Sequence, residues 1–198
     1  MPEPDPLRLL LSAAQSALLV VDVQERLVPA LPDADRLLAS VALLAQIARL
    51  LGVPTAVTEH CAGAIGGTVP ALKAELAHAV FVQKHHFAAT RAPAFAAVLQ
   101  AWRSRTVVVA GAEAHVCVMQ VALAMREAGM AVCVCADAVG ARHPDDTAIA
   151  LERMRMAGVV PVSVEMLATE WLEDAEDPRF REMLGWIKQR HRGRVSGR

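Results

Sequence analysis

The sequence predicts an α/β fold in which helices cover both faces of a central, mostly parallel sheet of about six strands. Short apolar runs alternate with stretches of helical periodicity along the 198 residues, which is the pattern of repeated β-α-β units. The strands are continuously apolar, as expected when both faces of a sheet are buried. The predicted fold class is therefore a three-layer α/β/α arrangement with Rossmann-like topology.

Six apolar runs predict the strands. The predicted strands are 17–23, 54–58, 79–83, 106–110, 131–136 and 159–164. Asp22 stands near the end of the first run, and Lys84 lies just past the third. Right-handed crossovers bring the carboxyl ends of parallel strands to one edge of the sheet, where such folds bind ligands. We therefore expect these two side chains at the same edge.

Helical periodicity, together with start and stop signals, predicts the helices. Asp33 is placed to cap the first helix, and Gly52, Gly129 and Gly158 are placed to end three of them. The predicted helices are 34–51, 70–77, 93–104, a central helix that closes at Gly129, 145–157, 166–172 and 178–190. A glycine-rich loop is expected at 59–69.

The central region, 106–129, reads TVVVAGAEAHVCVMQVALAMREAG. Gly111 ends its apolar run, and Cys117 falls in the first predicted turn of the helix that follows. Unpaired N–H groups and the positive end of the helix dipole lie at such a position, and both favour a thiolate. This arrangement predicts a nucleophile at the carboxyl edge of the sheet. The alternative is a small buried cysteine that packs the helix.

Length and composition predict one domain. We expect an N-terminal arm at 1–16, the main domain at 17–190 and a basic tail at 191–198. The net charge is −1, with no basic stripe before the tail, which argues against nucleic acid as the main partner. The longest uncharged apolar stretch, 9–21, is too short to span a membrane.

The cysteines and the N-terminus indicate a compartment. The acidic N-terminus lacks the basic region of a signal peptide. Cys61, Cys117, Cys133 and Cys135 match neither a zinc site nor a thioredoxin-type pair. Cys133 and Cys135 point to the same face of one strand and are poorly placed to bridge each other. A reducing cytoplasm is therefore the expected location.

An acid, a lysine and a thiol that meet at one edge predict covalent catalysis. Cys117 is the expected nucleophile, and Asp22 takes its proton and later returns it to a leaving group. Lys84 holds the carboxylate and stabilises the thiolate. The alternative is a structural ion pair between Asp22 and Lys84 beside a cysteine of the core.

Three stretches carry a resemblance to a known family. They are VVDVQERLVPAL with Asp22, QKHHFAA with Lys84, and VVVAGAEAHVCVMQVALAMREAGMAVCVCADAVGAR with Cys117. Over about 17–190 the chain resembles the isochorismatase-like cysteine hydrolases. TEHCAGAIGGTVPAL further resembles the isochorismatase domain-containing branch, whose substrates are mostly unsettled.

The resemblance implies a three-layer fold, an oligomer and hydrolysis of an amide, imide, carbamoyl group or vinyl ether. It implies that Asp22 is the general base, Lys84 the lysine and Cys117 the nucleophile. It also implies a cis peptide bond between Ala112 and Glu113. That bond would turn the N–H of Glu113 towards the N–H of Cys117, so that the two form an oxyanion hole.

The chain departs from two branches of that family. Nicotinamidase-like members bind a metal through Asp-x-His and a further His, whereas this chain has Glu59 and His60 without the second His. We therefore expect no metal and no other cofactor. Members that cleave vinyl ethers usually lack the cysteine that this chain keeps at Cys117, which points to acyl chemistry.

Several other residues are candidates for the pocket. Phe87, Gln24 and Ala112 are the expected substrate contacts, although Phe87 could belong to the core and Gln24 could instead tie down its loop. One of the adjacent His85 and His86 could face the site, because a strand-like backbone turns neighbours to opposite sides. Two more observations concern loops: Asp137 and Arg142 are expected to hold the loop after the fifth strand, and Glu113 either orders the entrance or is solvated.

The predicted function is therefore a cysteine hydrolase that cleaves a small amide-like C–N bond and forms a homo-oligomer, either a dimer or a tetramer. The alternatives are a weak or inactive small-molecule binding protein on the same fold, and vinyl-ether hydrolysis by general acid/base catalysis. The hypothesis of a Rossmann-type nucleotide-binding protein is weakened because no Gly-x-Gly-x-x-Gly motif follows the first strand. A redox-sensing thiol leaves Asp22 without a role.

Overall fold

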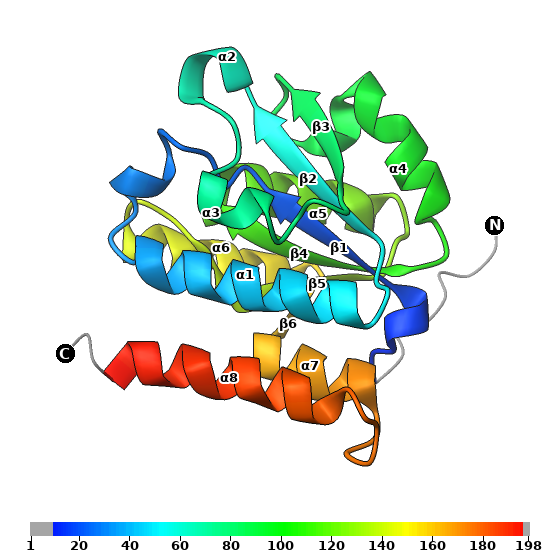
Figure 1. The fold of residues 1–198 in the computed structure, drawn as a ribbon. Helices are drawn as coiled ribbons and strands as arrows, with labels where there is room; N and C mark the ends of the chain where they lie inside the picture. Colours follow the sequence, from blue (N-terminus) through cyan, green and yellow to red (C-terminus); the bar gives the residue numbers. More distant parts are fainter. Residues whose placement is uncertain (1–9, 196–198) are drawn as a thin grey trace.

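A computed structural model describes residues 10–195 of the chain. Six strands form one sheet in the order β3-β2-β1-β4-β5-β6, and every neighbouring pair is parallel. The strands are β1 Ser16–Val21, β2 Thr55–His60, β3 Val80–Lys84, β4 Thr106–Ala112, β5 Val132–Gly140 and β6 Val160–Val162. Figure 1 shows this sheet with helices on both sides, which confirms the predicted fold class.

The predicted helices occur in the predicted order with shifted ends, and a further short helix, α2, lies in the segment that was predicted as a loop. They are α1 Ala34–Leu50, α2 Ala62–Ile65, α3 Pro70–Lys73, α4 Ala96–Ala101, α5 Met119–Glu127, α6 Pro144–Met156, α7 Val164–Leu172 and α8 Phe180–Val195. A π-helical turn, Ala114–Val118, precedes α5. Short 3-10 turns occur at Ala13–Gln15, Val28–Ala30, Ala89–Arg91 and Pro93–Phe95.

The core has two halves, one on each face of the sheet. Alternate side chains of β1 divide between them, so that Leu18 and Val20 pack in one half and Leu19 in the other. The first half is completed by residues of α1, α3, α7 and α8. The second half is completed by residues of α4, α5 and α6. Burial on both faces explains why the strands read as continuous apolar runs.

Gly111 brings β4 unusually close to β1. Its φ is +122°, and a Cβ added there would lie 2.1 Å from the carbonyl oxygen of Val21. The two residues are direct partners in the parallel register of β1 and β4. Only glycine fits this position, because any side chain would collide with the neighbouring backbone.

Several predicted boundaries were wrong by a few residues. β2 continues through Glu59 to His60 and the short helix α2 follows, so the loop predicted at 59–69 is wrong over much of its length. Lys84 is the last residue of β3 instead of lying beyond it. The nucleophile candidate Cys117 lies in the π-helical turn and not in the first turn of α5. β5 runs past Asp137 to Gly140, with an irregularity in its pairing to β4.

The arm expected at 1–16 lies largely outside the described residues, since the structure describes the chain from residue 10. Within the described part of the chain, no helix is both long and apolar enough to cross a membrane.

Candidate active site

Three side chains meet where the carboxyl ends of the strands converge. Asp22 directly follows β1, Lys84 ends β3, and Cys117 lies in the turn after β4. Strand order reverses between β1 and β4, which is the position at which open parallel sheets bind their ligands. Asp22 has a φ of +51°, a left-handed conformation that is uncommon for a residue other than glycine.

The lysine bridges the acid and the thiol. Lys84 Nζ lies 2.6 Å from Asp22 Oδ2 and 3.5 Å from Cys117 Sγ. The sulfur and the carboxylate therefore contact the same ammonium group and lie within a few Å of each other. The second carboxylate oxygen, Asp22 Oδ1, accepts a 2.7 Å hydrogen bond from the Thr58 hydroxyl. Both oxygens of the acid are thus fixed.

All three groups are almost completely removed from solvent. Asp22 is 1% exposed, Lys84 2% and Cys117 6%. A buried charge is costly unless it is paired and hydrogen-bonded, and the contacts of the Asp22 carboxylate and the Lys84 ammonium meet that requirement. Loss of either partner would leave the other charge uncompensated in the interior.

Sequence reasoning missed Thr58. It lies on β2 beside the end of β1, since Val21 and Thr58 are partners in the parallel register. The signal was present as a polar residue at the end of the predicted strand 54–58. It could be interpreted only once the pairing of β1 with β2 was known.

The surroundings of Cys117 favour the neutral thiol. Burial raises the pKa of Cys117, the charge and hydrogen bonding of the Asp22 carboxylate raise it further, and Lys84 opposes them only in part. The result is a pKa of about 12. From the sequence, the helix N-terminus and Lys84 favour the thiolate of Cys117, whereas the nearby Asp22 carboxylate favours the thiol. In the structure, burial and the carboxylate outweigh the lysine.

The turn that carries Cys117 begins with a cis peptide bond between Ala112 and Glu113, as the family resemblance implied. Ala112 is fully buried at the end of β4. The Glu113 carboxylate forms an ion pair with Arg142, in which Arg142 Nε lies 2.6 Å from Glu113 Oε1. The sequence allowed the Glu113 side chain either to order the site entrance or to be solvated, and the ion pair matches the first interpretation.

His60 and Phe87 form an aromatic pair beside the lysine. Their rings stack with centroids 5.2 Å apart. Burial lowers the pKa of His60, and the charge of Lys84 lowers it further against the opposing effect of Asp22. His60 and Lys84 are direct partners in the parallel register of β2 and β3, so the two residues lie side by side at the carboxyl edge of the sheet. Phe87 itself is 52% exposed and does not belong to the core.

Gln24 holds the loop after β1 together. Its amide nitrogen donates to the carbonyl groups of His60 and Gly66, and its amide oxygen accepts from the His60 N–H. Because the side chain is fully buried and both ends of its amide are engaged, we assign it to the backbone of this loop and not to substrate. This outcome matches the alternative interpretation for Gln24.

The histidines and Glu59 do not assemble a recognisable metal centre. Glu59 Oε1 accepts hydrogen bonds from the backbone and hydroxyl of Thr68. His85 and His86 are both exposed, and His85 Nδ1 lies 3.5 Å from Cys61 Sγ. Among the described residues, no group of three or more His, Cys, Asp or Glu side chains has the geometry to hold a metal ion.

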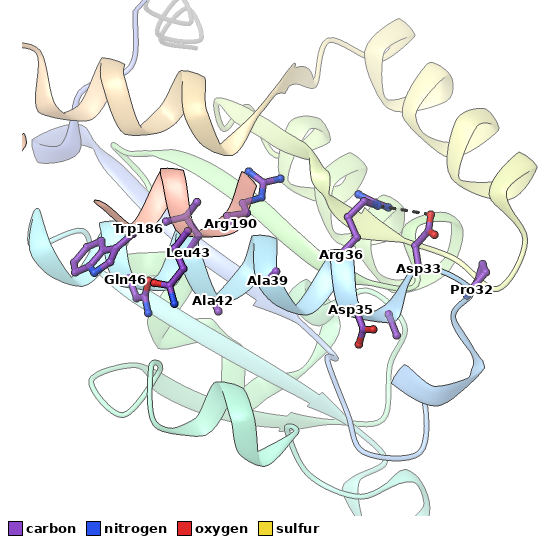
Figure 2. A pocket seen from close by; sticks show the side chains of 12 residues that line it. Pro32, Asp33, Asp35, Arg36, Ala39, Ala42, Leu43, Gln46, Trp186 and Arg190 are labelled. Atoms are coloured by element: carbon purple, nitrogen blue, oxygen red, sulfur yellow. Dashed lines mark ion pairs between the residues drawn. The ribbon is translucent and has the colours of Figure 1, made fainter. Parts of the chain in front are cut away.

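A separate cavity lies elsewhere on the molecule. It is a groove of about 800 Å³ between α1 and α8, shown in Figure 2. Side chains such as Leu43, Gln46 and Trp186 line one part of it, and Asp33 and Arg36 line another. Asp33 forms an ion pair with Arg36 there and makes no side-chain hydrogen bond to cap α1. None of the three residues of the buried cluster lines this groove.

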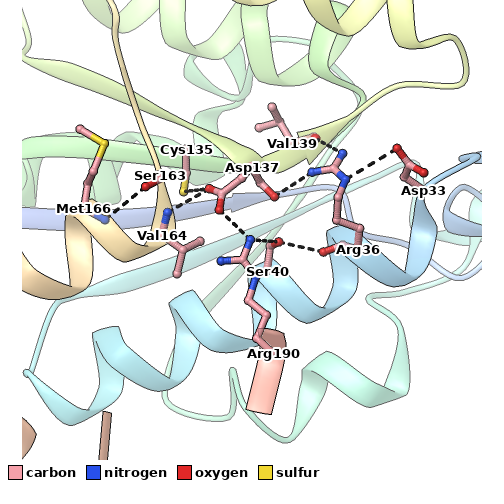
Figure 3. A network of polar contacts seen from close by, with 10 residues as sticks. All are labelled: Asp33, Arg36, Ser40, Cys135, Asp137, Val139, Ser163, Val164, Met166 and Arg190. Carbon is pink, nitrogen blue, oxygen red and sulfur yellow. Dashed lines mark hydrogen bonds and ion pairs between the residues drawn. The ribbon is translucent and has the colours of Figure 1, made fainter. Parts of the chain in front are cut away.

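Asp137 holds the C-terminal helix against the sheet, as Figure 3 shows. Its carboxylate accepts hydrogen bonds from Arg190 of α8 at 2.6 Å and from the Val164 N–H at 2.9 Å. Arg190 also donates to the Ser40 hydroxyl of α1. Asp137 lies within β5 and not in a loop after it, so the predicted role of Asp137 in that loop was wrong. Its contacts connect β5 to α1, α7 and α8, and this network stands apart from the Asp22–Lys84–Cys117 cluster.

Comparisons with known proteins identify the relatives of this chain. The profile of the Isochorismatase domain matches residues 16–166. Isochorismatase domain-containing protein 1 of Danio rerio is 34% identical over 178 residues, which cover 90% of this chain and 62% of that protein. The chain thus spans less than two thirds of the length of that curated relative.

Two solved structures have the same fold. Mar1 ribonuclease from Caenorhabditis elegans is 31% identical with a TM-score of 0.83, covering 89% of this chain and 91% of its own. The YcaC gene product of Escherichia coli, described as an octameric hydrolase of unknown specificity, is 25% identical with a TM-score of 0.86. The superposition covers 95% of this chain and 96% of the YcaC chain.

Proposed function

Because the chain belongs to the isochorismatase family, whose members include hydrolases, we propose that it is a cysteine hydrolase that cleaves a small amide-like C–N bond. The observation that carries the proposal is the position of Lys84 Nζ, which lies 2.6 Å from Asp22 and 3.5 Å from Cys117 in a buried site. A structural ion pair alone would not need a thiol as its third member.

The reaction begins with a neutral thiol, because the pKa of Cys117 is about 12. Asp22 accepts the thiol proton as the sulfur attacks the substrate carbonyl, so no free thiolate accumulates beforehand. Lys84 stabilises negative charge first on the carboxylate and then on the sulfur. The backbone N–H groups of Glu113 and Cys117 donate to the oxyanion of the tetrahedral intermediate.

Collapse of that intermediate breaks the C–N bond and leaves an acyl group on Cys117. Asp22, now protonated, gives its proton to the departing nitrogen. A water molecule then attacks the acyl carbon while Asp22 acts as the base again, and the thiol is restored. The substrate is a small molecule, and the reaction needs no metal or other cofactor. Ala112 and Phe87 are the proposed substrate contacts.

Two other activities are weaker candidates. Vinyl-ether hydrolysis by Asp22 as a general acid/base would use no covalent sulfur intermediate and would give Cys117 no role. The Caenorhabditis elegans neighbour carries the name of a ribonuclease, but the net charge of −1 of the present chain does not favour a polyanionic substrate.

The test is replacement of Cys117. We expect Cys117→Ala to reduce turnover of any accepted amide by at least about a thousandfold, leaving only the contribution of binding and the oxyanion hole. A panel of small primary amides, imides and carbamoyl compounds supplies the substrate. Intact-protein mass spectrometry should detect an acyl adduct on the wild type and none on the variant.

The other cysteines provide matched controls. Cys61→Ala, Cys133→Ala and Cys135→Ala should retain turnover, with a loss of stability of about 1 kcal/mol where the thiol is in the core. Full activity of a folded Cys117→Ala protein would mean that sulfur does not attack, and the general acid/base alternative would replace the proposal.

A further inference from the structure

Arg142 lies outside the Asp22–Lys84–Cys117 cluster but forms an ion pair with Glu113, the first residue of the turn that carries the thiol. We propose that Arg142 is a positioning residue for hydrolysis. Through its contact with Glu113, it holds the turn 113–117, with the sulfur and both oxyanion-hole N–H groups, in the reacting arrangement. This inference rests on the cysteine-hydrolase function proposed above.

The contact is two-pronged. Arg142 Nε lies 2.6 Å from Glu113 Oε1, and Arg142 Nη2 lies 3.4 Å from Glu113 Oε2. A guanidinium that meets both oxygens of a carboxylate fixes orientation as well as distance. The Glu113 side chain is 10% exposed, whereas the Arg142 side chain is 56% exposed. The arginine thus reaches from the surface to a nearly buried acid.

The two partners belong to neighbouring parts of the same edge. Glu113 directly follows β4, and Arg142 lies between β5 and α6. The last residues of these strands, Ala112 and Gly140, are partners in the sheet. The ion pair therefore continues the β4–β5 pairing beyond the end of the sheet, into the turn that carries Cys117.

Two further contacts bind the same turn and its following helix to α6. His115 Nε2 lies 3.7 Å from Asp146 Oδ2. Arg153 Nη1 lies 3.9 Å from Met119 Sδ. Both contacts are longer than the Glu113–Arg142 pair. We therefore assign most of the positioning to Arg142.

Position matters here because the turn supplies three reacting groups at once. A shift of about 1 Å in such groups can cost about a hundredfold in rate. Charge adds to this effect, since Arg142 neutralises a nearly buried carboxylate on the residue whose N–H donates to the oxyanion. Without Arg142, the unpaired carboxylate would oppose the negative charge that develops in the transition state.

The test compares Arg142→Ala, Arg142→Lys and Glu113→Gln in an assay of a substrate hydrolysed by the wild type. We expect Arg142→Ala to lower kcat by about tenfold or more while KM changes by less than about threefold. Arg142→Lys should recover part of the loss, because it keeps the charge without the two-pronged contact. The Glu113→Gln/Arg142→Ala double variant should be no slower than Arg142→Ala, since the pair acts as a unit.

Arg155 provides a matched control on α6. It makes the same kind of two-pronged contact with Glu152, through Nη2 at 2.7 Å and Nε at 3.0 Å, but its partner lies on its own helix. Arg155→Ala should leave kcat unchanged. Hydrogen exchange gives a second measurement, in which the amides of 113–118 should exchange faster in the Arg142 and Glu113 variants and at the wild-type rate in Arg155→Ala.

The outcomes separate this inference from the function on which it rests. A wild-type kcat and unchanged exchange in Arg142→Ala and Glu113→Gln, with an inactive Cys117→Ala, would overturn the role of Arg142 and leave the hydrolase proposal intact. Full activity of Cys117→Ala would overturn both. If Arg142→Ala fails to fold, kcat and KM of Arg142→Lys and Glu113→Gln test the role of Arg142 instead. A lower kcat with little change in KM would support that role, and a wild-type kcat would contradict it.

Discussion

Cys117 is protonated in the resting site although a lysine lies beside it. Burial and the Asp22 carboxylate raise the pKa of the thiol to about 12, and Lys84 compensates only in part. Asp22 therefore has two opposite effects on the reactivity of Cys117. It lowers the resting reactivity of the sulfur, yet in the proposed mechanism it is the base on which turnover depends.

Asp22→Asn separates these effects. Removing the negative charge should lower the pKa of Cys117 and increase its thiolate fraction at pH 9, so that iodoacetamide should alkylate Cys117 faster than in the wild type. Turnover should nevertheless fall by about a hundredfold or more, because the base and the proton donor are lost. Alkylation is followed by site-resolved mass spectrometry between pH 7 and 10.

Cys61 is the internal reference in this experiment, because it is a second, partly exposed thiol in the same chain. Its alkylation rate should be similar in the wild type and in Asp22→Asn. Slower alkylation of Cys117 in the variant would contradict the assigned direction of the pKa shift.

At the scale of single elements, the approach of β4 to β1 depends on Gly111. We expect Gly111→Ala to lower the free energy of unfolding by roughly 3 kcal/mol or more, because its Cβ would meet the Val21 carbonyl oxygen. Gly129→Ala is the control, since Gly129 also has a positive φ, +81°, but nothing lies within 4 Å of an added Cβ. It should cost only about 1 kcal/mol. Urea unfolding measures both, and equal losses would contradict the steric explanation.

The C-terminal helix makes a second prediction at this scale. Burial tends to raise the pKa of Asp137, but hydrogen bonds from Arg190 and the Val164 N–H, with the charge of Arg190, hold it below its usual value of 3.8. A carboxyl group whose pKa is lowered by folding stabilises the protein above its unfolded pKa. That contribution is lost as the pH falls through the folded value.

Arg190→Gln should therefore destabilise the protein by about 1–3 kcal/mol at pH 7. The difference from the wild type should shrink as the pH falls below about 4, because protonated Asp137 no longer favours the arginine. Urea unfolding at a series of pH values checks this trend. A difference that does not change with pH would mean that Arg190 acts through packing alone.

The sequence predicted the number of strands and the edge at which Asp22, Lys84 and Cys117 meet, because buried strands leave a continuous apolar pattern. It did not predict that β2 extends through Glu59 and His60. Those residues are polar, and the groups that satisfy them, from Thr68 and Gln24, come from other parts of the chain. The pattern of apolar and polar residues within a segment does not indicate hydrogen-bond partners that come from other segments.

Two features of the site could not be predicted from local sequence: the π-helical turn and the Glu113–Arg142 ion pair. The π-helical turn Ala114–Val118 lies between β4 and α5, and apolar periodicity does not distinguish so short a turn from the first turn of the α-helix that follows. The Glu113–Arg142 pair joins residues 29 positions apart, and only the pairing of β4 with β5 brings them together. The identities of the reacting groups follow from local sequence, whereas the contacts that position them follow from topology.

At the scale of the whole molecule, the single chain leaves several large apolar side chains in contact with water. Val80 and Phe81, on the edge strand β3, are 57% and 41% exposed. On α6, Ile149 is 66% exposed and Met156 is 80% exposed. Ile149 and Met156 lie two helical turns apart on one face of α6, and exposed apolar side chains that cluster in this way often mark a surface for association.

We therefore predict that the full chain forms a homo-oligomer in solution. The YcaC neighbour is described as an octamer, whereas the prediction for the present chain rests on its own exposed apolar side chains. Burial of exposed apolar surface releases about 25 cal/mol for each Å², so association would be favoured wherever such surfaces from two copies meet. Light scattering coupled to size-exclusion chromatography, over a dilution series at micromolar concentrations, measures the molar mass directly. We expect a mass of two or more chains that persists on dilution. A mass of one chain throughout the series would contradict the prediction, and the apolar side chains on β3 and α6 would then need a different partner.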